Sequence, residues 1–225
     1  MGQAIGQVLS LGVGVSLSPV PIIGVVLMLS TPRARSNGPA FLFGWVLGLA
    51  VAGTVVLLIS SGADASEKGQ PADWVSVLKL VLGALLLLVA ARQWRGRPGD
   101  GEEASMPKWM QTIDQFEPPK AAGLGILLSA VNPKNLLLIV AAAAAISQTG
   151  ASAGGQAVAL AVFVVIATVG PGAPVAIYFA LGARSKRILE DLKTWMSQNN
   201  AAIMAVICLI IAAKLIGDGI TGLSA

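Results

Sequence analysis

The chain has 225 residues, of which 55% are hydrophobic and only 12% are charged, and its mean hydropathy is +0.78. A soluble domain has about 45–50% apolar and about 25% charged residues, so this composition excludes an ordinary soluble fold. The net charge is +4. No basic patch is interleaved with aromatic residues, so this charge favours contact with an anionic membrane and gives no support for a nucleic-acid partner.

Six apolar segments are long enough to cross a hydrocarbon layer of about 30 Å, which takes about 20 helical residues. We therefore predict an all-α integral membrane protein with six transmembrane helices. In chain order the predicted spans are 3–30, 39–61, 73–91, 120–146, 156–181 and 201–220.

The lysines and arginines of the connections predict the orientation. The first, third and fifth connections carry several basic residues each, whereas the second has Lys68 alone among acidic residues and the fourth has no charge. Short basic loops stay in the cytoplasm. The odd connections are therefore predicted to be cytoplasmic, and both termini are predicted to lie outside.

An internal repeat relates the two halves of the chain. The segments GVGVSLSPVP (12–21) and GLGILLSAVN (123–132) share Gly, Gly, Leu, Ser and Val at matching places. Duplication of a unit with three spans inverts the second copy, as in many transporters. We predict one repeat in 1–93, a connecting loop in 94–119 and an inverted repeat in 120–225; chance similarity between helices rich in small residues is the alternative.

Three of the predicted spans contain helix-breaking residues near their middle. Proline removes a backbone hydrogen bond and clashes with the preceding turn, and the freed polar groups are tolerated in a membrane only beside protein or a wet cavity. We predict that spans one, four and five are broken around one substrate-binding cavity; kinks that serve packing alone are the alternative. The predicted cavity residues are Ser18, Pro19, Pro21, Asn132, Pro133, Lys134, Asn135, Gly170, Pro171, Gly172 and Pro174.

Lys134 is the ionisable residue nearest the middle of any span. On insertion scales a charged side chain at the bilayer centre costs about 2.5–3.5 kcal/mol. Two hypotheses explain what offsets that cost. In the first, the lysine binds an anionic head group beside Asn132 and Asn135. In the second, it bonds to carbonyls freed by the prolines and holds two broken helices together. Lys79, close to the outer start of its span, is expected to snorkel to the interface.

The segment SLSPVPIIGVVLMLSTPRARSNGPAFLFGWVLGLA (16–50), together with NPKN (132–135), resembles the GAP family of actinobacterial lipid-addressing proteins within the LysE superfamily of exporters. Amino-acid exporters of that superfamily carry Pro-Gly-Pro in the first helix, where this chain has Val20 in place of the glycine. The resemblance implies a LysE-like fold in the bacterial inner membrane and movement of a glycolipid, such as a glycopeptidolipid or sulfolipid, toward the cell surface.

We accordingly expect an exporter or flippase-like carrier of an anionic amphiphilic lipid that works by alternating access, without a cofactor or metal. A LysE-like exporter of amino acids or other small anionic or zwitterionic metabolites is one alternative. An enzyme is disfavoured because the chain has no His and one Cys, so the usual general bases and metal ligands are missing.

A scaffold that helps to assemble a lipid-export complex is the other alternative. In residues 105–119, Trp109, Ile113 and Phe116 recur at helical spacing, which predicts a short amphipathic helix on the inner leaflet. Such a helix anchors the loop or docks lipid-export or synthesis machinery. The Gly-x-x-x-Gly pattern of Gly44 and Gly48 permits close helix packing, in this chain or in a homodimer.

Overall fold

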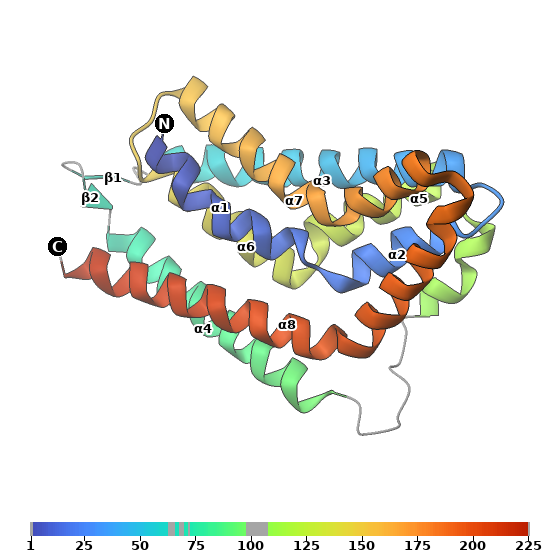
Figure 1. Ribbon diagram of the computed structural model, residues 1–225. Coiled ribbons are helices and arrows are strands. Elements are labelled where there is room, and N and C mark those ends of the chain that lie inside the picture. The colour runs from blue at the N-terminus through green and yellow to red at the C-terminus, as the bar shows by residue number, and fades with distance from the viewer. Residues whose placement is uncertain (1, 63–65, 68–69, 72, 98–107, 225) are drawn as a thin grey trace.

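The computed structural model describes residues 2–62, 66–67, 70–71, 73–97 and 108–224, which form an elongated bundle of helices along one axis (Figure 1). A short antiparallel pair, β1 (Ser66–Glu67) and β2 (Gln70–Pro71), lies near one end. The helices are α1 (Gly2–Ser16), α2 (Pro19–Leu29), α3 (Ala34–Gly62), α4 (Asp73–Arg95), the 3₁₀ helix η1 (Lys108–Gln115), α5 (Pro118–Ile126), the π-helical turn η2 (Leu127–Val131), α6 (Pro133–Ser147), α7 (Ala153–Leu181), the 3₁₀ turn η3 (Gly182–Arg184) and α8 (Ser185–Leu223).

The predicted break in the first span is present. Helices α1 and α2 meet at an angle of 53°. Pro19 and Pro21 have no backbone N–H, so the carbonyls of Val15 and Leu17 lose their ordinary helical donors. Ser18 is the N-cap residue of α2, and Pro19 occupies the first helical position, which proline favours.

The predicted break in the fourth span is present as well. Helices α5 and α6 are bent by 61° through η2. The backbone N–H of Asn132 donates to the carbonyl of Leu127 at 3.2 Å, five residues back, which is the spacing of a π turn. Asn132 then caps α6, because its Oδ1 accepts the backbone N–H of Lys134 at 3.1 Å.

The predicted break in the fifth span is wrong. Helix α7 runs without interruption from Ala153 to Leu181, with Pro171 and Pro174 inside it. Both prolines are buried. Membrane helices tolerate interior proline where neighbouring groups satisfy the freed backbone. One residue before Pro171, the N–H of Gly170 donates to the Ser16 hydroxyl of α1 at 2.8 Å, so α7 is bonded to α1 at this point.

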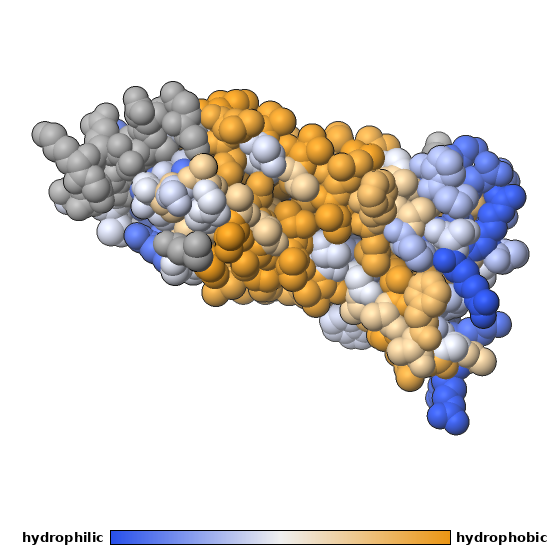
Figure 2. Space-filling model, turned by 90° about the horizontal axis from the view of Figure 1, so that it is seen from above, coloured by the Kyte–Doolittle hydropathy of each residue, from blue (hydrophilic) through white to orange (hydrophobic). Residues whose placement is uncertain are grey.

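The bundle has two ends with an apolar belt between them. Both termini lie at one end, and the turns that join α2 to α3 and α7 to α8 lie at the other (Figure 1). Figure 2 shows an apolar belt that gives way to a hydrophilic end. Among the described residues, three helical stretches are long and apolar enough to cross a membrane, or five if each bent pair is one span. The chain is therefore a helical membrane protein.

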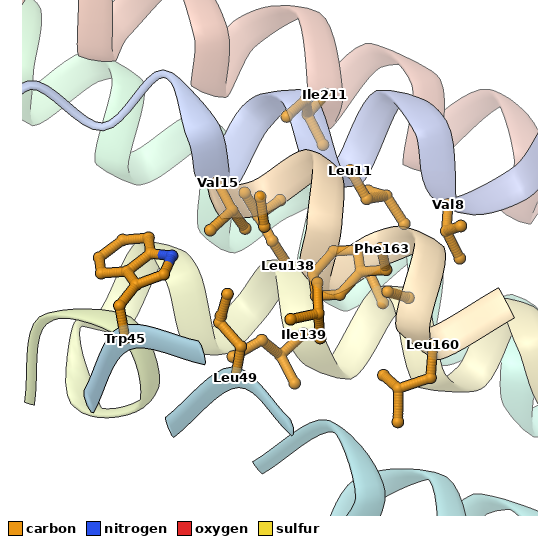
Figure 3. Packing of buried hydrophobic residues seen from close by; sticks show 14 of the residues in the cluster. Val8, Leu11, Val15, Trp45, Leu49, Leu138, Ile139, Leu160, Phe163 and Ile211 are labelled. Carbon is orange, nitrogen blue, oxygen red and sulfur yellow. The ribbon is translucent and has the colours of Figure 1, made fainter. Parts of the chain in front are cut away.

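The core is centred on α1, which packs against α6 and α7. Val15 of α1, Leu138 of α6 and Phe163 of α7 are buried in one cluster (Figure 3). Helix α4 packs along α8, and a Cβ on Gly83 would lie 2.7 Å from Ile216 Cγ1. These contacts hold the bent helix pairs among the longer helices of the bundle.

The Gly-x-x-x-Gly pattern of α3 packs inside the chain. A Cβ on Gly44 would lie 1.9 Å from the Ala122 carbonyl oxygen, and one on Gly48 would lie 2.2 Å from Ser129 Oγ. The two glycines thus allow α5 and η2 to approach α3 closely. Because this face is covered by the chain's own helices, the pattern gives no support for a homodimer.

The predicted short helix in the long connection is present as the 3₁₀ helix η1. Residues 105–107 of the prediction lie outside the described part of the chain. Met110 and Ile113 are buried against the protein, and Phe116 is half-buried. The Phe116 carbonyl accepts Asn37 Nδ2 of α3 at 2.8 Å. The apolar side of this segment therefore covers the bundle, because α2 and α8 offer it apolar side chains and α3 offers it the Asn37 amide.

Candidate functional site

The two helix breaks face each other and are joined by hydrogen bonds. Lys134 Nζ donates to the Gly14 carbonyl at 2.7 Å and to Ser18 Oγ at 2.6 Å. Ser18 Oγ lies 3.1 Å from Asn135 Oδ1 and 2.7 Å from the Val15 carbonyl. The Lys134 side chain is only 2% exposed, and Asn135 is fully buried. The ammonium group thus ties the α1–α2 break to the start of α6.

The partners of Lys134 are groups that the first break sets free. In a continuous helix the Gly14 carbonyl would accept the N–H of Ser18, four residues on. At the bend that N–H instead lies 3.3 Å from the Val15 carbonyl. A buried carbonyl without a donor is costly, so the ammonium supplies the bond that the helix no longer makes.

The second break is satisfied in a similar way. The π turn directs the Asn132 N–H to Leu127, and this leaves the Leu128 carbonyl without its helical donor. Asn135 Nδ2 donates to that carbonyl at 2.9 Å. The same amide group therefore stabilises its own break through nitrogen and contacts Ser18 through oxygen.

Of the cavity residues predicted on α7, one glycine contacts the first break. A Cβ on Gly170 would lie 1.8 Å from the Ser16 carbonyl oxygen, so α7 reaches the first break at a distance that only glycine permits. Gly172 has room for a side chain, since a Cβ there would have Thr168 Cγ2 as its nearest neighbour at 3.9 Å, an ordinary van der Waals contact. We define the break cluster as Gly14, Ser16, Ser18, Lys134, Asn135 and Gly170.

The structure brings together some of the predicted site residues and gives the others different roles. Ser18, Lys134 and Asn135 meet in the break cluster, whereas Asn132 caps α6. Pro19, Pro21 and Pro133 shape the breaks at helix starts. Sequence reasoning missed Gly14 and Ser16. The position of Gly14 four residues before Ser18 was the available indication, because a break after Ser18 frees that carbonyl.

A neutral donor lies in the same region of the core. Trp45 of α3 is fully buried and stacks on Phe41, with ring centroids 6.1 Å apart. Its Nε1 atom has no hydrogen-bond partner within the described part of the chain. Helix α5 passes close to it, since a Cβ on Gly125 would lie 2.8 Å from the Trp45 backbone nitrogen. The indole N–H is thus a buried donor that no described group accepts.

A second lysine is buried near the end that holds the termini. The expectation that Lys79 snorkels to the interface is wrong, because its side chain is 3% exposed and Nζ donates to Gln148 Oε1 at 2.7 Å. Gln148 follows the end of α6 and offers a neutral acceptor that keeps the ammonium inside. Lys214 and Asp218 form an ion pair on α8, with Nζ and Oδ2 2.6 Å apart.

An apolar groove lies between α4 and α8. Its cavity volume is about 630 Å³ and nearly all of its lining is hydrocarbon. At its end, the Arg97 guanidinium lies 4.2 Å from the centre of the Trp94 ring. Such a lining suits an acyl chain better than a polar group. The lining residues are Leu87, Ala90, Ala91, Trp94, Ala205, Val206 and Leu209.

Fold and site together define a helical membrane protein in which two broken helices are bonded to each other across the core. The model of the family described as "Sap, sulfolipid-1-addressing protein" matches residues 8–221. The chain therefore belongs to this family, which confirms the predicted resemblance to the Sap-like GAP proteins; membership of the LysE superfamily stays a prediction. Neither the curated proteins nor the solved structures gave a match.

Proposed function

We propose that this chain exports or flips an anionic amphiphilic lipid, most simply a glycolipid, across the bacterial inner membrane. The family description connects its members with the addressing of a sulfolipid, whose sulfate is an anionic head group. The break cluster is the observation that carries the proposal. It places one cation and several neutral hydrogen-bonding groups where two broken helices meet, as substrate sites of transporters do.

The proposal includes six spans in two inverted repeats, with both termini outside. The stretch Ala153–Leu223 counts as two spans in this scheme, because the chain turns back at Gly182, which has φ +52°. The position of both termini at one end supports an even number of spans (Figure 1). The N-cap residues Ser18 and Asn132 occupy corresponding places in the two bent pairs, although the sequence match pairs Ser18 with Ser129.

In the proposed mechanism, the bonds of Lys134 hold one state of the carrier. A head-group sulfate, phosphate or carboxylate replaces the Gly14 carbonyl and Ser18 hydroxyl as partner of the ammonium. The two bent pairs then separate and the site opens toward the other face of the membrane. The Trp45 N–H supplies a further donor for the polar head group.

The scaffold alternative receives less support from η1. Docking was predicted through Trp109, Ile113 and Phe116, but Ile113 is buried in the protein and Phe116 is half-buried. We also propose a carrier rather than an enzyme, because the chain has no His and the buried Lys134 bonds to neutral groups. Val20 between Pro19 and Pro21 likewise separates the first break from that of the amino-acid exporters.

Purified protein in liposomes tests the proposal. A fluorescent sulfated glycolipid, placed in one leaflet, should reach the other leaflet faster than in protein-free vesicles, and its uncharged parent glycolipid should move more slowly. Movement that requires a second protein would favour the scaffold. Efflux of amino acids without lipid movement would favour the LysE-like alternative.

A further inference from the structure

A second cavity lies at the end of the bundle opposite the termini, where α7 turns into α8. Its volume is about 420 Å³, within the range of small-molecule sites. Its walls come from the start of α3, the end of α7, η3 and the start of α8. The lining residues are Arg35, Tyr178, Phe179, Gly182, Ala183 and Lys186.

Packing between α3 and α7 explains why these residues meet. A Cβ on Gly38 would lie 3.6 Å from Val175 Cγ2, so the two helices are in contact there. They run in opposite directions (Figure 1), and one turn further toward the same end come Arg35 on α3 and Tyr178 on α7. Gly182, with φ +52°, then reverses the chain and brings Lys186 to the rim.

The chemistry of the cavity suits an anion attached to a ring. Arg35 and Lys186 bring two positive charges from different helices, and neither forms an ion pair with any residue that the structure describes. An arginine fork binds sulfate, phosphate or carboxylate through paired hydrogen bonds. The rings of Tyr178 and Phe179 stand edge to face, with centroids 5.3 Å apart, and offer aromatic surface beside the charges.

The surroundings of the cavity suit an amphiphile. Phe179 is 53% exposed and Leu181 is 44% exposed, so apolar side chains continue from the rim to the outer surface of the bundle. The whole molecule shows the same change, from an apolar belt to a hydrophilic end (Figure 2). A ligand seated between Arg35 and Lys186 can therefore keep its hydrocarbon chains in the membrane.

We propose that this cavity is a collection site for the anionic sugar head group of an amphiphilic lipid, separate from the break cluster. Arg35 and Lys186 bind the anion, and Tyr178 and Phe179 contact the sugar ring. The inference rests on the proposed function for its place in transport, as the site that receives the lipid before the break cluster does. Binding at the cavity is measured without transport, so the two proposals can fail separately.

The single tyrosine of the chain makes the test specific, because Tyr178 lies in the cavity. Protein labelled with 3-fluorotyrosine should give one ¹⁹F resonance in phosphatidylcholine nanodiscs. Sulfated galactosylceramide should shift it saturably, and galactosylceramide, which lacks only the sulfate, should bind at least about tenfold more weakly. Arg35→Gln and Lys186→Gln should each weaken binding about tenfold. Arg187→Gln should not, because this exposed neighbour does not line the cavity.

Four results would overturn the site. Three of them are a shift of the ¹⁹F resonance equal to that caused by sulfated galactosylceramide, produced by galactosylceramide, by sodium sulfate alone, or by phosphatidylglycerol at the same mole fraction. The fourth is a loss of binding in Arg187→Gln equal to that in Arg35→Gln and Lys186→Gln. The third would show general attraction to an anionic membrane. Lipid movement in liposomes with no sulfate-dependent shift at Tyr178 would remove this inference and leave the proposed function intact.

Discussion

Lys134 Nζ lies 2.7 Å from the carbonyl oxygen of Gly14, a residue 120 positions earlier in the chain. The bond joins the first turn of α6 to the last turn of α1, so it connects the two broken helices directly. Of the two hypotheses for this lysine, the described geometry favours the structural one. Its contact with an anionic head group stays a prediction for another state of the protein.

Lys134→Met tests the bond. The change keeps a similar length but leaves the buried Gly14 carbonyl and Ser18 hydroxyl without the ammonium, so the free energy of unfolding should fall by about 1–3 kcal/mol. At about 2–4 °C per kcal/mol, the thermal midpoint in detergent should fall measurably. Combination with Ser18→Ala should cost less than the sum of the two changes. An unchanged midpoint together with lost lipid transport would favour the head-group hypothesis instead.

Two glycines of α7 provide a matched pair. Gly170→Ala should destabilise the protein by about 3 kcal/mol or more, because the new methyl group overlaps the Ser16 backbone and α7 must move away from α1. In Gly172→Ala the new methyl group meets only an ordinary contact with Thr168, so the change should stabilise the helix by about 0.5–1 kcal/mol. Thermal midpoints of the two variants check this; similar midpoints would show that α7 does not approach the first break as described.

The Gly-x-x-x-Gly face of α3 gives a third prediction. Gly44→Ala should lower the thermal midpoint because its methyl group meets the Ala122 backbone, whereas Gly123→Ala on α5 has open space around it. Neither change should alter the oligomeric mass in detergent, measured by light scattering. A Gly44→Ala variant that keeps its midpoint and loses a dimer would restore the homodimer hypothesis.

Cysteine labelling tests the orientation. In a Cys208→Ala background, Ser224→Cys should react with a membrane-impermeant maleimide on intact cells, and Ser36→Cys should react only after permeabilisation. Both positions are exposed, and they lie at opposite ends of the bundle. Labelling of Ser36→Cys alone would reverse the proposed orientation. Labelling of both on intact cells would contradict a membrane-crossing bundle with these two ends.

The membrane location, two of the helix breaks and the family could be predicted from the sequence, because each depends on residues that are adjacent in the chain. Composition alone indicated a membrane protein, because apolar side chains fill its helical stretches. The breaks at Pro19 and Pro133 followed from the missing proline N–H, which no neighbour can restore. The family resemblance rested on contiguous residues around those same breaks, and the family match confirmed it.

Only the tertiary structure decided which groups satisfy one another. Pro171 and Pro174 have the same local chemistry as Pro19, yet α7 stays continuous where Ser16 of α1 lies beside Gly170. Lys79 could extend to the interface, but Gln148 offers its ammonium an acceptor inside. Lys134 could have had only a bound ligand as its partner, but the Gly14 carbonyl lies within hydrogen-bonding distance of its ammonium group. Each outcome depends on a partner distant in the chain, and a buried polar group takes whichever partner the packed helices bring within reach.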